Sequence, residues 1–271
     1  MSRPTSVALG SLLAFALLAA ALHWRGRDES SDATGRALVV YAAPAVRVPM
    51  EAVARDYESE TERRIELRFG PSEDILTKAG MADPVEPADL FLPADGSYVS
   101  MADGRGLIAE RIPLASMRAV VLLGKGNPKG LAAWPDLLRD GVKVAVANPG
   151  AAVGKIVREH LVATGRWEAL RPRAIDTGTV TEAANAAKLG SVDAALVWDA
   201  VAAGYPELGT LEPPELAGAV ATVEIAVLKQ SPDAAAALRF ARYVAADDGG
   251  MKRFRAAGFR TVSGPTRGEW K

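Results

Sequence analysis

The chain has 271 residues, enough for one large domain or two medium ones that each bury a hydrophobic core. Its 32 Lys and Arg residues nearly balance its 33 Asp and Glu residues, and the two signs are intermixed, so we expect no nucleic-acid partner. The sequence contains no cysteine, which excludes disulfides, thiolate nucleophiles, thiolate metal sites and anchoring through a lipid-modified cysteine.

The N-terminus carries Arg3 and then an apolar run from Val7 to Leu22. A short positive region followed by such a run is typical of a secretory signal, and the small residues Ala19 to Ala21 suit a cleavage site. The run is shorter than the roughly 20 apolar residues of a bilayer span. Residues 1–24 are therefore predicted to be a signal peptide, with an uncleaved signal-anchor as the alternative, and residues 25–36 a polar linker.

Beyond the linker, short apolar runs alternate with helical patterns, which predicts parallel sheets with crossover helices. The expected strands cover residues 38–43, 65–69, 88–92, 117–123, 142–147, 194–198 and 222–228. The expected helices begin near Met50 and at Ser72, cover 98–102 and 154–164, run from 179 or 180 to about 190, and cover 232–246 and 249–257.

This order predicts an α/β protein with two lobes joined by a hinge. Residues 37–116 and 222–271 are expected to form the first lobe and its C-terminal tail, with residues 117–221 inserted as the second lobe. A ligand should then lie at the carboxyl ends of the strands, where loops and helix N-termini converge.

Four strand-to-helix turns are expected to reach that place, at residues 43–48, 69–72, 148–154 and 177–181. A helix N-terminus has unpaired N–H groups and a partial positive charge, so it can hold an anion without Lys or Arg. Ser72 also suits the N-cap of its helix, where its hydroxyl would accept a bond from a first-turn N–H.

The stretch Ala-Asp-Leu-Phe-Leu-Pro-Ala-Asp at residues 88–95, taken with the strand at 38–43 and the turn Phe69-Gly70-Pro71-Ser72, resembles the molybdate-binding proteins of ABC importers. The resemblance extends from about Ala37 to Phe259. It implies a two-lobe, periplasmic-binding-protein-like (type II) fold, each lobe a mainly parallel sheet flanked by helices. It also implies a monomeric, extracytoplasmic binding protein, without a cofactor or catalytic activity, that delivers a small oxyanion to an ABC permease.

The resemblance also suggests which residues contact the ligand. Ser72 matches the family's ligand serine in Phe-x-x-Ser, and Trp198 stands where the family has a tyrosine. At the first turn, Ala45 replaces the family's serine, so only the N–H groups of Ala45 and Val46 can contribute there. The predicted ligand-binding residues are therefore Ser72, Ala45, Val46, Val153, Gly154, Val180 and Trp198.

The segment that supplies Val153 and Gly154, residues 148–155, resembles the family's Asp-Pro segment. It is not a nucleotide-binding P-loop, because its glycines are one residue too close and Ile156 stands where Ser or Thr must bind magnesium. A Gly-rich turn without a ligand stays possible here, as does a purely structural role for Trp198.

Two rival functions stay open. Glu73, Asp74, Glu182 and Asp199 with the Trp198 ring could bind a cation such as a polyamine. Only His23 and His160 are present, which disfavours a His-based triad or zinc site, but a hydrolase with paired carboxylates is not excluded. The sequence leaves open which oxyanion is bound, whether molybdate, tungstate, sulfate or another.

Overall fold

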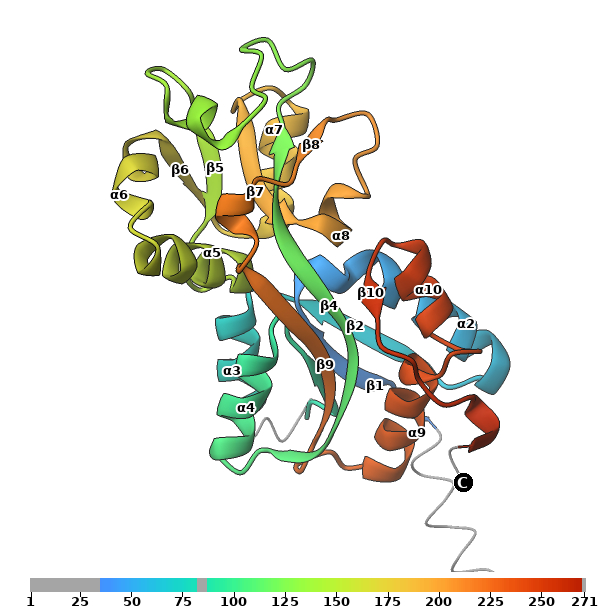
Figure 1. The fold of residues 1–271 in the computed structure, drawn as a ribbon. Coiled ribbons are helices and arrows are strands. Elements are labelled where there is room, and N and C mark those ends of the chain that lie inside the picture. The colour runs from blue at the N-terminus through green and yellow to red at the C-terminus, as the bar shows by residue number, and fades with distance from the viewer. Residues whose placement is uncertain (1–34, 82–86, 270–271) are drawn as a thin grey trace, which may run out of the picture. The chain divides into compact units, whose positions relative to one another are not determined.

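The computed structural model describes residues 35–81 and 87–269, and residues from Leu38 onward form the compact unit considered below (Figure 1). The predicted signal segment and nearly all of the predicted linker lie outside the described residues, so both stay predictions. Within the described part of the chain, no helix has the length and apolar character needed to cross a membrane.

The first lobe is built on three parallel strands in the order β2-β1-β3. The long strand β9 pairs antiparallel with β3, and the long strand β4 pairs antiparallel with β9. The strands are β1 (Leu38–Ala42), β2 (Ile65–Phe69), β3 (Leu90–Leu92), β4 (Ile108–Leu123), β9 (Val220–Leu228) and the short β10 (Arg260–Thr261), which pairs with β4. Its helices are η1 (Pro44–Val46), α2 (Arg47–Thr61), α3 (Ser72–Gly80), α4 (Gly96–Gly104), α9 (Ala234–Ala245), α10 (Met251–Ala256) and η5 (Arg267–Glu269).

The second lobe contains a parallel core in which β5 pairs with both β6 and β7, while β7 and β8 run antiparallel to β4. Its strands are β5 (Val144–Ala147), β6 (Ala174–Thr177), β7 (Ala194–Trp198) and β8 (Thr210–Leu211). Its helices are η2 (Trp134–Leu138), α5 (Ala152–Ala163), α6 (Trp167–Leu170), η3 (Arg171–Arg173), α7 (Val180–Lys188), α8 (Asp199–Ala202) and η4 (Pro214–Leu216). Strand β4 thus pairs with strands of both lobes (Figure 1).

A strand of a parallel sheet that is covered on both faces has all its side chains buried, so its sequence is a continuous apolar run. All five residues of β1 and all five of β7 are buried. The two-lobe α/β fold predicted from the sequence is confirmed, whereas the residues at which each lobe begins and ends stay a prediction.

Two strand predictions need correction. The strand expected at 117–123 is only the second half of β4, whose first half alternates between buried and exposed residues and contains Pro113. Strand β6 was not predicted, because it is an edge strand in which Ile175 and Asp176 are exposed and the apolar signal is weak.

Asp89, in the first Ala-Asp pair of the 88–95 motif, has a structural role. Its side chain is fully buried, and its carboxylate accepts hydrogen bonds from the Val39 N–H at 2.8 Å and the Ser231 hydroxyl at 2.6 Å. A buried carboxylate is tolerated only when its oxygens are paired in this way. Asp89 thereby fixes the start of β3 against β1, and the residues after β3 reach the site from that fixed position.

Candidate functional site

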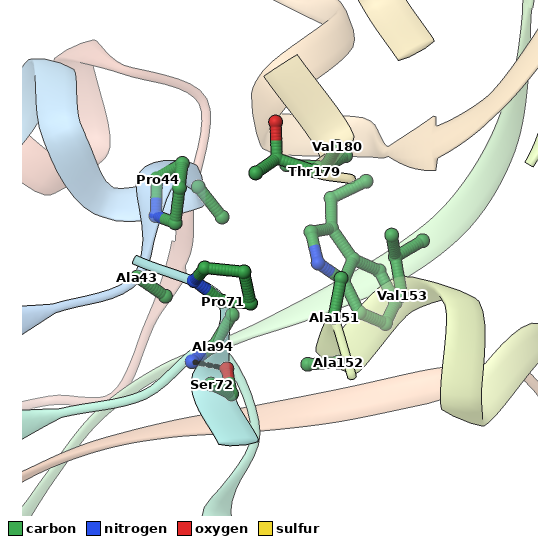
Figure 2. Close-up of a pocket in the computed structure, with 12 residues that line it drawn as sticks. Ala43, Pro44, Pro71, Ser72, Ala94, Ala151, Ala152, Val153, Thr179 and Val180 are labelled. Carbon is green, nitrogen blue, oxygen red and sulfur yellow. Dashed lines mark hydrogen bonds between the residues drawn. The ribbon is translucent and has the colours of Figure 1, made fainter. Parts of the chain in front are cut away.

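A small cavity lies where residues of both lobes meet, and all four predicted turns contribute to its wall (Figure 2). Its lining residues are Ala43, Pro44, Ala45, Pro71, Ser72 and Ala94 from the first lobe, with Ala151, Ala152, Val153, Thr179, Val180 and Trp198 from the second. The cavity volume is about 10 Å³, close to the space one water molecule needs. A tetrahedral ion would therefore enter only as the lobes move slightly apart.

Ser72 lies in this wall at the first position of α3. The predicted N-cap role is wrong: Pro71 occupies the cap, no side-chain capping bond forms, and the Ser72 Oγ instead accepts a bond from the Ala94 N–H at 3.2 Å (Figure 2). Through this bond the side chain contacts the segment that follows the end of β3. Ser72 is 1% exposed, and its own proton has no acceptor among the residues that the structure describes.

The N-terminus of α5 supplies the opposite wall through Ala152 and Val153. No side chain caps this helix, and first-turn N–H groups have no carbonyl partner within their own helix. Gly154 does not line the cavity. A Cβ at Gly154 would lie 2.1 Å from the Ala147 carbonyl oxygen and 2.2 Å from that of Asn148, so glycine is what lets α5 start against the end of β5.

The start of α7 reaches the cavity through Thr179 and Val180. The Thr179 hydroxyl caps α7 by accepting a bond from the Glu182 N–H at 3.1 Å, and it points away from Ser72 in Figure 2. The Glu182 carboxylate in turn accepts from the Gly178 N–H at 2.7 Å. The side chains of Thr179 and Glu182 are thus used to build the turn.

At the first turn, Ala45 lines the cavity but Val46 does not. The Val46 N–H donates to the Ala43 carbonyl at 3.1 Å within the turn, and Pro44 has no N–H. The sequence prediction that Val46 also offers a donor is therefore not supported, because the 3-10 turn uses that group.

Trp198, the last residue of β7, is fully buried and lines the cavity. Its indole N–H is buried and has no hydrogen-bond partner in the described part of the chain. The next residue, Asp199, accepts bonds from the Arg118 N–H and the Arg260 Nε, each at 3.0 Å. These bonds fix the end of β7, and with it Trp198, against β4 and β10.

The predicted cation site is not assembled. None of Glu73, Asp74, Glu182 and Asp199 lines the cavity, and the Asp199 carboxylate is already paired with Arg260. Among the described residues, no group of His, Asp and Glu side chains could hold a metal ion. His160 lies elsewhere, with its Nε2 3.0 Å from the Glu215 carbonyl. The lining residues thus offer neutral donors without a carboxylate, which suits an anion.

Contacts between the lobes surround the cavity. The Glu73 N–H donates to the Gly150 carbonyl at 3.2 Å, and the Lys155 Nζ donates to the Ser97 Oγ at 2.9 Å. The same Nζ lies 4.9 Å from the centre of the Tyr98 ring. Burial and then the nearby Glu73 carboxylate raise the pKa of Tyr98 to about 12, so this ring stays neutral at physiological pH.

Comparisons with known proteins agree with this architecture. A family model described as bacterial extracellular solute-binding protein matches residues 38–260. The molybdate-binding protein ModA of Mycobacterium tuberculosis is 28% identical over 218 residues, which cover 79% of this chain and 81% of ModA. A thiosulfate-binding protein of Pseudomonas aeruginosa is 42% identical over a shorter stretch of 72 residues, or 23% of this chain.

Solved structures share the fold at lower identity. The periplasmic molybdate-binding protein of Azotobacter vinelandii superimposes with a TM-score of 0.69 at 19% identity, covering 82% of this chain and 98% of its own. The sulfate-binding protein SubI of Mycobacterium tuberculosis gives a TM-score of 0.69 at 20% identity, covering 83% and 87%.

Proposed function

Because this chain belongs to the bacterial extracellular solute-binding proteins, we propose that it captures a small tetrahedral oxyanion, with molybdate or tungstate favoured, for an ABC importer. It is a binding protein related to molybdate and sulfate binders, and its relatives are not enzymes. A permease is the expected partner, and an extracytoplasmic location follows if residues 1–24 act as a signal.

The observation that carries the proposal is the cavity that Ser72 lines together with the start of α5, which no side chain caps, and the start of α7. We infer that two helix N-termini from one lobe and a hydroxyl from the other would supply N–H and O–H donors to an anion in this cavity. Helix starts bind anions because their first N–H groups are unpaired and the helix dipole is positive there.

The same cavity supports an oxyanion over a cation. Its lining residues include no carboxylate, and their side chains are apolar apart from Ser72, Thr179 and Trp198. An ammonium ligand would need carboxylates or carbonyl groups to balance its charge, since burying an unpaired charge is costly. The polyamine and hydrolase alternatives therefore receive no support from the site.

The proposal is tested with the purified protein by thermal-shift measurements against molybdate, tungstate and sulfate, followed by calorimetry on Ser72→Ala. A ligand at a hundred times its dissociation constant adds about 2.7 kcal/mol of stability. Ser72→Ala should weaken binding at least about tenfold, because a hydrogen bond to a charged partner contributes roughly 1.5 to 3 kcal/mol. Ser59→Ala, at an exposed position of α2, is the control and should bind normally.

Ser72→Ala should also lower the free energy of unfolding by about 1 kcal/mol or more, because the Ala94 N–H loses its acceptor. Failure of every oxyanion to stabilise the wild-type protein would refute the proposed function. Normal affinity in Ser72→Ala would show that the serine serves only to hold Ala94.

A further inference from the structure

We propose that this chain also binds organic oxyanions, in which an apolar carbon group replaces one oxygen of the tetrahedral ion, and that a groove beside the cavity holds the carbon group. An alkanesulfonate is the simplest ligand of this class. The inference rests on the proposed function, because the charged head of such a ligand would occupy the same cavity.

The groove lies between the lobes and adjoins the cavity. Its volume is about 290 Å³, and it is lined by η1, the start of α2 and the end of α10 from the first lobe, with α7 and α8 from the second. Pro44 and Ala45 line both the groove and the cavity. On the opposite lobe, Val180 of the cavity wall is followed directly by Thr181 of the groove wall. The two spaces therefore meet at the turn that contains Pro44 and Ala45.

The wall that the two spaces share is poor in hydrogen-bond donors. Pro44 has no N–H, the Ala45 side chain is a methyl group, and the Val46 N–H already donates to the Ala43 carbonyl at 3.1 Å. The Ala45 N–H is thus the most that η1 can offer. The donors of the proposed site, Ser72 and the starts of α5 and α7, belong to other parts of the wall. An oxygen facing η1 would lose most of its hydrogen bonds with water, whereas a carbon substituent there needs none.

The side chains of the groove suit an apolar group rather than a second polar one. Apart from Arg47, Thr181 and Tyr205, the residues that line it are apolar or glycine. The Arg47 guanidinium already bonds the Glu51 carboxylate at 3.3 Å, and the Tyr205 hydroxyl donates to the Asn185 amide oxygen at 2.9 Å. A polar substituent would therefore find few free partners here, and leaving it unpaired would be costly.

The groove presents apolar surface to solvent and is already formed in this structure. Val48, which lines it, is 69% exposed. On its other side, α10 ends so close to α8 that a Cβ at Gly258, which has a φ of 83°, would lie 2.8 Å from the Ala203 Cβ (Figure 1). Walls from both lobes are thus held together. A carbon group in the groove would cover part of the apolar surface, which favours binding because that area is removed from water.

The test is calorimetric titration of the wild-type protein with methane-, propane- and pentanesulfonate, which share one charged head and differ only in chain length. Affinity should rise about threefold to fourfold for each methylene that enters the groove. Pentanesulfonate should therefore bind at least about tenfold more tightly than methanesulfonate. 2-Hydroxyethanesulfonate matches propanesulfonate in size but ends in a hydroxyl, so it should bind more weakly than propanesulfonate.

A double variant locates the carbon chain. Val48→Thr with Val201→Thr keeps the branched shape of two groove side chains and adds a hydroxyl to each. It should reduce the advantage of pentanesulfonate over methanesulfonate at least about threefold. Molybdate affinity should stay unchanged, because neither residue lines the cavity. Val162→Thr, at an exposed position of α5 outside the groove, is the matched control and should change neither measurement.

The outcomes separate this inference from the proposed function. Affinity that stays flat or falls with chain length, while molybdate or sulfate binds, would overturn the inference and leave the proposed function standing. An unchanged dependence on chain length in the folded double variant would also overturn it, because the carbon chain would then lie elsewhere. If the wild-type protein binds neither the inorganic oxyanions nor any sulfonate, the proposed function fails and the inference fails with it.

Discussion

The form in which the lobes meet around the cavity is called the closed form below, and replacing Lys155 by Met should loosen it and weaken ligand binding. Lys155 lies on α5 of the second lobe, and its Nζ donates to the Ser97 Oγ of α4 in the first lobe at 2.9 Å. Ser97 is itself hydrogen-bonded to the buried Asp95 carboxylate. Methionine keeps most of the length of the side chain and removes only the charge and its donors.

The magnitude follows from the two contacts. A hydrogen bond from a charged donor contributes roughly 1.5 to 3 kcal/mol when buried, and less at the half-buried Lys155 because solvent screens the charge. The Nζ lies 4.9 Å from the Tyr98 ring centre, and such a contact adds about 0.5 to 1 kcal/mol. Losing both should disfavour the closed form by about 1 to 2 kcal/mol. The bond from the Glu73 N–H to Gly150 remains, so closure should be weakened rather than abolished.

The assay is calorimetric titration with molybdate together with small-angle scattering of the ligand-free protein. Affinity should fall by about fivefold to thirtyfold, because the ligand must supply the closure energy that the lysine no longer provides. The radius of gyration without ligand should rise. Lys78→Met, at an exposed position of α3, is the matched control. Unchanged affinity and unchanged scattering in Lys155→Met would refute this account of the interlobe contact.

The central strands could be predicted from the sequence because they are continuous apolar runs. Strands β1 and β7 are fully buried, and such runs have few interpretations other than central parallel strands. Edge strand β6 lacked this signal, since half of its residues face solvent. The full length of β4 could not be predicted, because its pairing with both lobes depends on partners far away in the sequence, such as Trp198, which pairs with Ala119, and Val220, which pairs with Arg118.

The sequence predicted which turns line the cavity but not which hydrogen bonds their residues form. Ser72, Ala45, Val153, Val180 and Trp198 all line the cavity, since the carboxyl ends of parallel strands converge. Their hydrogen-bond partners could not be foreseen from sequence spacing. The Ser72 bond to Ala94 joins residues from separate turns, and Ala94 was overlooked although it lies inside the 88–95 motif.

Two further variants test two separate points: how α5 is positioned against β5, and whether the ligand is an anion or a cation. Gly154→Ala should destabilise the protein by roughly 1 to 3 kcal/mol and reduce ligand binding, because the new Cβ would lie 2.1 Å from the Ala147 carbonyl oxygen and push α5 away from β5. Chemical denaturation measures the loss of stability. A free energy of unfolding equal to that of the wild-type protein would contradict the prediction. The double variant Glu73→Gln with Asp74→Asn tests the sign of the ligand. Both carboxylates lie in the first turn of α3, outside the cavity wall, so they can only repel a bound anion through space. Molybdate affinity should therefore stay unchanged or improve by up to about 1 kcal/mol, given screening at exposed sites. Loss of the favourable dipole interaction should lower stability by about 0.3 to 1 kcal/mol per carboxylate, which the same denaturation measurement detects. Titration with putrescine provides the opposing arm: putrescine binding in the wild-type protein that disappears in the double variant would mean that the site holds a cation.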